Sequence, residues 1–141
     1  PGITTSTAIS GYWQPSTDGW IPSVSLGWGW NSTRYREGVD HAGLVAISQS
    51  WTVAVQWSDL FNTGTAMGAA VGQPIIATAL VDGTNPDDAG YVMEWWTMLP
   101  VTDAITVTPA VFFLSRPLGA DTPEGQQLNQ LGALVKTTLR F

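Results

Sequence analysis

The stretch Gly132-Ala133-Leu134-Val135-Lys136-Thr137-Thr138-Leu139-Arg140-Phe141 decides the fold. In an extended strand, successive side chains point to opposite faces. One face of this stretch holds Ala133, Val135, Thr137, Leu139 and Phe141, and the other holds Leu134, Lys136, Thr138 and Arg140. An apolar face toward lipid, cations toward an aqueous lumen and an aromatic residue at the interface are typical of a strand in a transmembrane β-barrel.

The composition agrees with strands that have one face in lipid and one in water. The chain has 141 residues, which is enough for one domain over 1–141. Only 11% of its residues are charged, against about 25% in typical soluble domains. Its mean hydropathy is only +0.09, because Thr, Ser, Gly, Asn and Gln replace the missing charges. The eight Trp residues suit a membrane interface, since the indole ring is apolar and its N–H is polar.

Several classes of function are disfavoured. A net charge of −6 argues against nucleic acid as a partner. The chain has no Cys, which leaves no disulfide framework and no thiolate metal site. No apolar run reaches the length of about 18 residues that a spanning helix needs. Because the chain starts at Pro1 without Met, we expect either processing or a longer parent protein.

Alternation and turn residues predict about seven antiparallel strands. Their ranges are 4–14, 20–31, 47–58, 65–74, 90–100, 104–115 and 131–141. Pro109 is expected to mark a bulge or a missing ladder bond, and the Gly- and Ala-rich strand 65–74 leaves its faces unassigned. The predicted connections alternate between short (15–19, 59–64, 101–103) and long (32–46, 75–89, 116–130), as the periplasmic turns and extracellular loops of bacterial barrels do. Seven strands predict no closed antiparallel barrel, because the first and the last run in the same direction.

Charges are nearly absent from the predicted strands, where only Glu94, Lys136 and Arg140 occur. A charge on the lipid face costs about 2–4 kcal/mol at the bilayer midplane, so all three are predicted to face the lumen. The predicted pore-lining residues are Thr52, Gln56, Glu94, Thr106, Thr108, Lys136, Thr138 and Arg140.

Aromatic residues gather on the opposite, apolar strand faces, near the predicted strand ends. We expect Trp28, Trp30, Trp51, Trp57 and Trp95 to form an interfacial girdle, although a track of rings that stacks sugars is an alternative for the Trp set. Trp13 and Trp96 have no assigned place, and Trp96 is the one candidate for a sugar platform.

Seven stretches resemble the OprB family of porins, in particular its cyanobacterial branch of carbohydrate-selective or iron-uptake type. They are GWIPSVSLGWG at 19–29, VQWSD at 55–59, AVGQP at 70–74, EWW at 94–96, DAITVTPA at 103–110, LSRPLG at 114–119 and LVKTT at 134–138. The resemblance runs from about residue 19 to residue 141 and covers only the carboxy-terminal part of that family's barrel.

The resemblance implies about seven carboxy-terminal strands of a larger barrel with 16 or 18 strands. Such a protein is a trimer in a bacterial, in this branch cyanobacterial, outer membrane. It lets small hydrophilic solutes, either inorganic ions or carbohydrates, diffuse passively. The implied partners are outer-membrane lipid and the barrel-assembly machinery, which reads the last strand with Phe141. No cofactor, metal or enzymatic activity is implied.

Two rival interpretations of the whole chain remain open. One is a soluble, Trp-rich β-sandwich that binds carbohydrate, which does not require the alternation of short and long connections. The other is a small complete barrel with an eighth strand hidden in residues 1–12. The loop Asp82–Asp88 is rich in carboxylates that calcium favours, but turn chemistry explains it without metal. Asp40 beside His41 is far from a catalytic constellation, because no nucleophile accompanies the pair.

Overall fold

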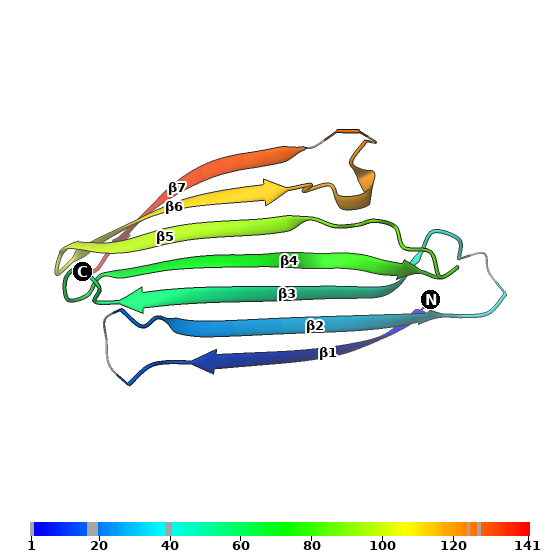
Figure 1. Ribbon diagram of the computed structural model, residues 1–141, viewed down its shortest axis with the longest axis horizontal. Helices are drawn as coiled ribbons and strands as arrows, with labels where there is room; N and C mark the ends of the chain where they lie inside the picture. The colour runs from blue at the N-terminus through cyan, green and yellow to red at the C-terminus, as the bar shows by residue number, and fades with distance from the viewer. Residues whose placement is uncertain (1, 17–19, 39–40, 124, 127) are drawn as a thin grey trace.

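The protein forms one seven-stranded antiparallel sheet in which every strand pairs with its neighbours in the chain (Figure 1). The structure is a computed structural model, and it describes residues 2–16, 20–38, 41–123, 125–126 and 128–141. The strands are β1 (Gly2–Trp13), β2 (Ser23–Tyr35), β3 (Val45–Ser58), β4 (Ala66–Leu80), β5 (Tyr91–Thr102), β6 (Ile105–Ser115) and β7 (Asn129–Leu139). A short 3-10 helix, Gly119–Asp121, lies between β6 and β7.

The all-β prediction and its seven strands are confirmed, and the sheet is open. Within the described residues, β1 and β7 each pair with one neighbour only. Residues 2–13 form the single strand β1, so the idea of an extra strand hidden in residues 1–12 is wrong for the described part of that segment. The connections 36–44, 81–90 and 116–128 lie at one end of the sheet, which we call the loop rim. The opposite end, where β7 finishes, is the C-terminal rim (Figure 1).

Two strands extend well beyond their predicted ends. β2 continues to Tyr35 because polar residues that suggested a loop pair with polar residues of β1, as in Thr4 with Thr33, whose hydroxyls are 2.8 Å apart. β4 continues past Pro74 to Leu80 along β3, with register shifts between Val45 and Trp51. As a result, the connection 14–22 is as long as 36–44, and the predicted short–long alternation holds only for the later pairs of connections.

Pro109 interrupts the hydrogen-bond ladder between β5 and β6 without shifting the register of the two strands. On one side it pairs in register with Val135 of β7. On the other side, the pairs between β5 and β6 stop at Trp96–Ala110 and resume at Leu99–Val107 in the same register. Proline lacks the N–H that a ladder needs, so the predicted missing bond is confirmed and the predicted bulge is not.

A single row of paired residues crosses the whole sheet and defines its apolar face. The row is Trp13, Val24, Val55, Ala69, Trp95, Val111 and Ala133. The next row belongs to the polar face and reads Tyr12, Ser25, Ala54, Ala70, Glu94, Phe112 and Gly132. Paired residues share a face, so the two faces are fixed for all seven strands, including β4.

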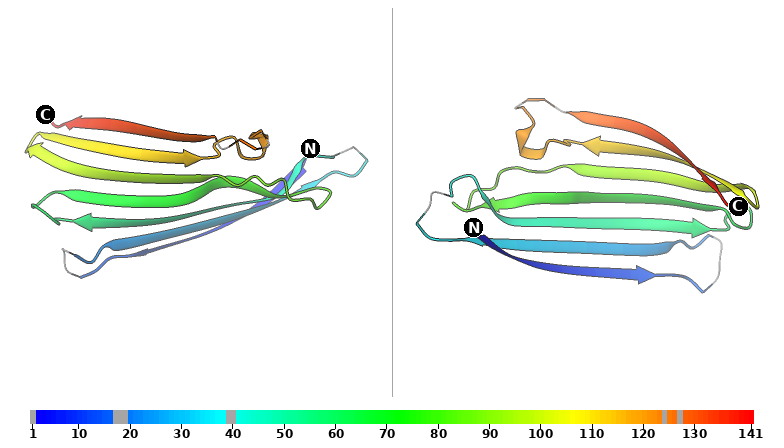
Figure 2. Two further views of the ribbon diagram at one scale, coloured as in Figure 1. Left: turned by 45° about the horizontal axis from the view of Figure 1, so that its top comes forward. Right: turned by 180° about the vertical axis from the view of Figure 1, so that it is seen from behind.

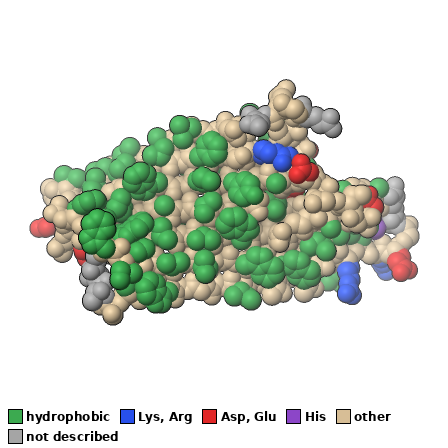
Figure 3. Space-filling model, in the orientation of Figure 1, with side chains coloured by type: hydrophobic (Ala, Val, Ile, Leu, Met, Phe, Trp, Pro, Cys, Tyr) green, Lys and Arg blue, Asp and Glu red, His purple; other side chains and the backbone are tan. Residues whose placement is uncertain are grey.

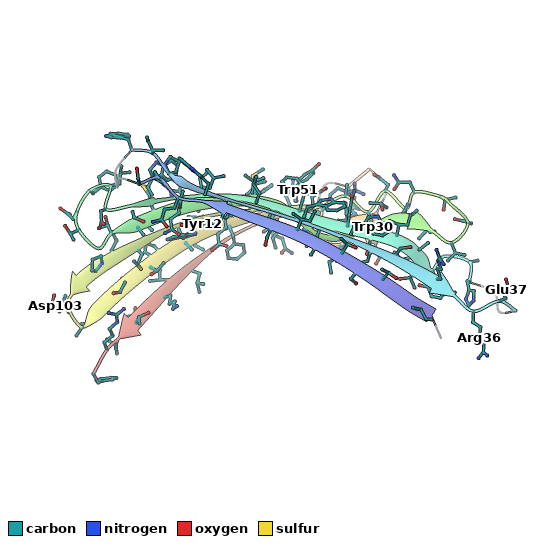
Figure 4. The ribbon with its side chains drawn as sticks, turned by 90° about the horizontal axis from the view of Figure 1, so that it is seen from below. Tyr12, Trp30, Arg36, Glu37, Trp51 and Asp103 are labelled. Carbon is teal, nitrogen blue, oxygen red and sulfur yellow. The ribbon has the colours of Figure 1, made fainter. Side chains whose placement is uncertain are left out.

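Neighbouring strands are staggered: along the apolar row, each strand is displaced from the one before it by about one residue, measured from the C-terminal rim. The apolar row starts at Trp13, the last residue of β1, and ends at Ala133, six residues before β7 finishes at Leu139. The sheet is also bowed. Figure 4 shows it as an arch with Trp51 of the apolar face on the convex side, and the two views of Figure 2 show the same curvature and twist.

Neither face of the sheet is covered by another element of the described residues. On the apolar face, Ile9, Leu26, Trp95 and Leu131 are 67%, 54%, 56% and 77% exposed. Apolar side chains spread across this face from β1 to β7 (Figure 3). The buried apolar residues of the described chain are only Ala66, Ile76 and Ala110. A conventional core between two layers is therefore absent from the part of the chain that the structure describes.

Candidate pore-lining face and membrane-facing surface

The eight predicted pore-lining positions share one face of the sheet. Glu94 belongs to the polar row, and Thr52 and Gln56 lie on β3 at even spacing from its member Ala54. On the far strands, Thr106 pairs with Thr138 and Thr108 pairs with Lys136. The structure brings these residues together on the concave, polar face. Arg140 follows in the same alternation, but β7 ends at Leu139. Its backbone N–H still donates to the carbonyl of Ala104 at 2.9 Å.

The ionisable side chains of this face are spread along it. The row of Glu94 meets β7 at Gly132, four residues before Lys136, which is about 14 Å along a strand. Both side chains are exposed. The ion pair found among the described residues joins Arg116 and Asp87 at 3.4 Å instead. Lys136 and Glu94 are thus both exposed to solvent on this face.

Arg34 corrects the expectation that β2 carries no charge. It lies inside β2, pairs with Ile3 and is therefore on the apolar face. Arg34 is eleven residues from Ser23, where β2 begins at the C-terminal rim. The apolar face tolerates this cation because it lies so far from that rim. The side chain is exposed and close to the loop rim, where a cation stays hydrated.

Two aromatic rings lie flat on the polar face, each over a glycine of the next strand. A Cβ built on Gly68 would lie 2.6 Å from the ring of Trp96, and one on Gly132 would clash with the ring of Phe112. Both rings are half-buried, and Ala110 beside them is 8% exposed. The sequence left Trp96 without a place, because only the register shows which glycine faces it.

The Trp residues of the apolar face form two tiers rather than one. Trp57 lies next to the last residue of β3 and Trp13 ends β1, so both lie at the C-terminal rim. Trp28, Trp30, Trp51 and Trp95 lie five to seven residues inside their strands, counted from the same rim. The prediction that Trp28, Trp30 and Trp51 sit near strand ends is therefore wrong, because β2 and β3 continue beyond the apolar field.

Two indole N–H groups on this face, those of Trp51 and Trp57, have hydrogen-bond partners. Trp51 donates to Gln73 Oε1 at 2.7 Å, and Gln73 is only 8% exposed. The ring of Trp51 also packs edge-to-face with Tyr91, with centroids 6.4 Å apart. Trp57 donates to the carbonyl of Trp20 at 3.0 Å. The polar atoms of these side chains are thus satisfied without water, which an apolar environment requires.

In the acidic loop 82–88, the carboxylates of Asp82 and Asp88 accept hydrogen bonds that stabilise turns and connections. Asp82 accepts from both the hydroxyl and the N–H of Thr84, at 2.7 and 2.9 Å, and these bonds lower the pKa of Asp82 below its usual 3.8. Asp88 accepts the N–H of Ala77 at 2.8 Å and that of Ala120 at 3.1 Å. Asp88 thereby fastens two loops to the end of β4. No group of three potential metal ligands was found among the described residues.

The lone histidine has a structural setting. His41 Nε2 lies 2.7 Å from the carbonyl oxygen of Arg36, and its ring is 5.0 Å from that of Tyr35. Asp40, its neighbour in the sequence, is outside the described residues. Phe141 lies beyond the end of β7 and is fully exposed, and its role as an assembly signal stays a prediction.

Comparisons with known proteins add no relative. No family model, no curated protein and no solved structure matches the chain. In the described parts of the chain, no helix has the length and hydropathy of a membrane span.

Proposed function

We propose that this sheet is part of the wall of an outer-membrane porin, a water-filled β-barrel through which small hydrophilic solutes diffuse passively. The observation that carries the proposal is a bowed, uncovered sheet whose convex face is apolar and whose concave face is polar. In a barrel, lipid covers the convex apolar face, and the water of the channel contacts the concave polar face. Such a wall has no catalytic role, and the resemblance to OprB-family porins agrees with it.

The stagger of the strands supports a barrel geometry. One residue per step corresponds to a rise of about 3.4 Å for every 4.8 Å across the sheet, or a tilt of about 35°. Strands of outer-membrane barrels tilt by about 35–45°. A flat sheet without such a stagger closes less readily into a cylinder.

The height of the apolar field supports a membrane. On β7 and β6 it extends from the C-terminal rim to Leu131 and Phe113, each eight residues inside. At the tilt above, eight residues correspond to about 22 Å, close to the apolar band of about 25 Å in outer-membrane barrels. Gln49 and Arg34 follow beyond it on β3 and β2. Trp13 and Trp57 border the field at one side, and the second Trp tier lies toward the other.

The open edges support a larger parent barrel. β1 and β7 run in the same direction, because seven strands alternate, and single-chain bacterial barrels have even strand numbers with antiparallel seams. Further strands must therefore separate β1 from β7. We take the barrel of 16 or 18 strands, the trimer and the cyanobacterial outer membrane from the resemblance, as parts of the same proposal.

Single-channel recording tests the proposal. The full-length protein that contains this chain is added to a planar bilayer with a salt gradient across it. We expect stepwise increases in conductance, because the polar face lines a permanent aqueous path. A protein that stays soluble without detergent and never raises the conductance would contradict the proposal. That result would favour the rival, a soluble carbohydrate-binding sandwich, in which a second sheet has to cover the apolar face.

A further inference from the structure

The apolar face is not smooth, because a hollow of about 520 Å³ crosses it from β3 to β7. Its floor is at Ala69, whose neighbours in the apolar row are the larger Val55 and Trp95. Met93, Phe113 and Leu131 line its other side. The hollow exists because a methyl group stands between larger side chains in the middle of the sheet.

The hollow lies inside the apolar field and rises toward the loop rim. Ala69 is three residues inside β4, while Leu131 is eight residues inside β7, both counted from the C-terminal rim. The whole hollow is therefore at the depth that the proposed function gives to hydrocarbon. An elongated apolar group fits this place, and a polar solute does not.

A cation stands beyond the upper end of the hollow. Arg116 follows Phe113 by three residues, about 10 Å along the strand, and its N–H pairs with the carbonyl of Leu128. Figure 3 shows a basic and an acidic group on this face beyond the end of β6, at the border of the apolar field. The bonds of the Arg116 side chain to the carbonyls of Asp87 and Gly119 and to the Asp87 carboxylate all use Nη2. Within the described residues, Nε and Nη1 keep their donors for another acceptor.

We propose that this surface is a lipid site, in which an acyl chain fills the hollow over Ala69 and a phosphate headgroup meets Arg116. The inference rests on the proposed function and names one partner of its membrane face: a phosphorylated lipid of the leaflet on the side of the loop rim. The apolar lining recognises the chain, and the guanidinium recognises the phosphate. A second copy of the protein is the rival occupant, but a stable protein contact needs about 800 Å² per partner, far more than one hollow offers.

Native mass spectrometry of the full-length protein in detergent tests this site, with phosphatidylglycerol and diacylglycerol of identical acyl chains as probes, because only the first carries a phosphate. We expect tighter retention of phosphatidylglycerol. Ala69→Trp fills the floor and excludes at least about two methylenes, which lowers the affinity about tenfold. The matched control is Ala133→Trp, in the same row but outside the hollow, and it leaves retention unchanged.

The headgroup contact has its own matched pair of variants. Arg116→Gln lowers retention of phosphatidylglycerol and leaves that of diacylglycerol, which has no phosphate, unchanged, whereas Arg34→Gln, at another place near the loop rim, changes neither. Equal loss from Ala69→Trp and Ala133→Trp overturns the inference, as does equal retention of both lipids. A change in oligomer mass with unchanged lipid retention overturns it in favour of the second copy. Conductance of the same protein decides the porin proposal separately, since the hollow lies on the face away from the lumen.

Discussion

In the proposed channel, Lys136 is the residue whose position bears most directly on permeation. It lies on the polar face opposite Thr108, is exposed and forms no ion pair with Glu94. Lumen charges tune the selectivity of barrels. Lys136→Glu therefore shifts the reversal potential of the channel in a salt gradient toward that of cations.

The control for this substitution is Arg34→Glu, which makes the same change of charge on the other face of the sheet. We expect it to shift the reversal potential less than Lys136→Glu does. An unchanged reversal potential in Lys136→Glu would show that this cation only hydrates the wall.

Gly68 is required by the ring of Trp96. Because a Cβ at this position would lie 2.6 Å from the ring, Gly68→Ala overpacks the polar face and costs about 1–3 kcal/mol of unfolding free energy. Urea unfolding of the full-length protein in detergent or lipid vesicles measures this loss. Gly11→Ala is the matched control, because nothing lies within 4 Å of a Cβ there.

The double variant Gly68→Ala/Trp96→Ala shows whether the cost of a side chain at residue 68 comes from a clash with the ring of Trp96 or from some other contact. If the ring is the obstacle, the added methyl costs less in the Trp96→Ala background than in the wild type. Equal costs in both backgrounds would contradict the explanation.

At the scale of the strand, neighbouring residues of β3 predict opposite outcomes. Val53 lies on the apolar face, five residues from the C-terminal rim, and Thr52 lies on the polar face. In the proposed membrane wall, Val53→Lys places a charge in hydrocarbon and costs about 2–4 kcal/mol. Thr52→Lys keeps its charge in channel water and costs much less.

Folding free energies in lipid vesicles measure both variants of β3. A soluble sandwich that buries the apolar face also loses stability on Val53→Lys, so the informative comparison is with and without lipid. A difference between the two variants that persists in aqueous buffer without detergent would contradict the membrane assignment.

Strands were predictable from the sequence where the residue types of the two faces contrast. β3 alternates Trp and Val with Thr, Ala and Gln, and β7 alternates apolar residues with Lys136, so their faces followed from the pattern. β4 offered no contrast, since Gly68, Ala69, Ala70 and Gly72 are all small, and its faces came only from pairing with β3 and β5.

Strand ends and cross-strand contacts were not predictable, because they depend on partners distant in the sequence. Asn31 looks like a turn residue, yet its side chain donates to Ser48 Oγ at 3.1 Å inside the sheet. The hollow over Ala69 and the rings over Gly68 and Gly132 likewise arise from register. That the predicted pore-lining residues share one face of the sheet was predictable, because polar residues alternate with apolar ones on each strand; their role in a pore stays a prediction.

At the scale of the whole molecule, the uncovered apolar face predicts how the protein behaves in solution. Contiguous apolar patches on monomeric soluble proteins rarely exceed a few hundred Å², whereas this face extends across all seven strands (Figure 3). We expect the full-length protein to partition with membranes and to remain dispersed only in detergent. Cell fractionation followed by detergent removal measures this behaviour. A monodisperse protein after detergent removal would favour a water-covered or protein-covered face.

The pairing of each strand with only its neighbours in the chain has a consequence for the evolution of such walls. No strand is inserted between two others, so each hairpin is a self-contained unit of the ladder. Gaining or losing one hairpin by duplication or deletion leaves every other pair in place and changes only the circumference. A family built this way can vary the width of its cylinder without redesigning the chemistry of any single strand.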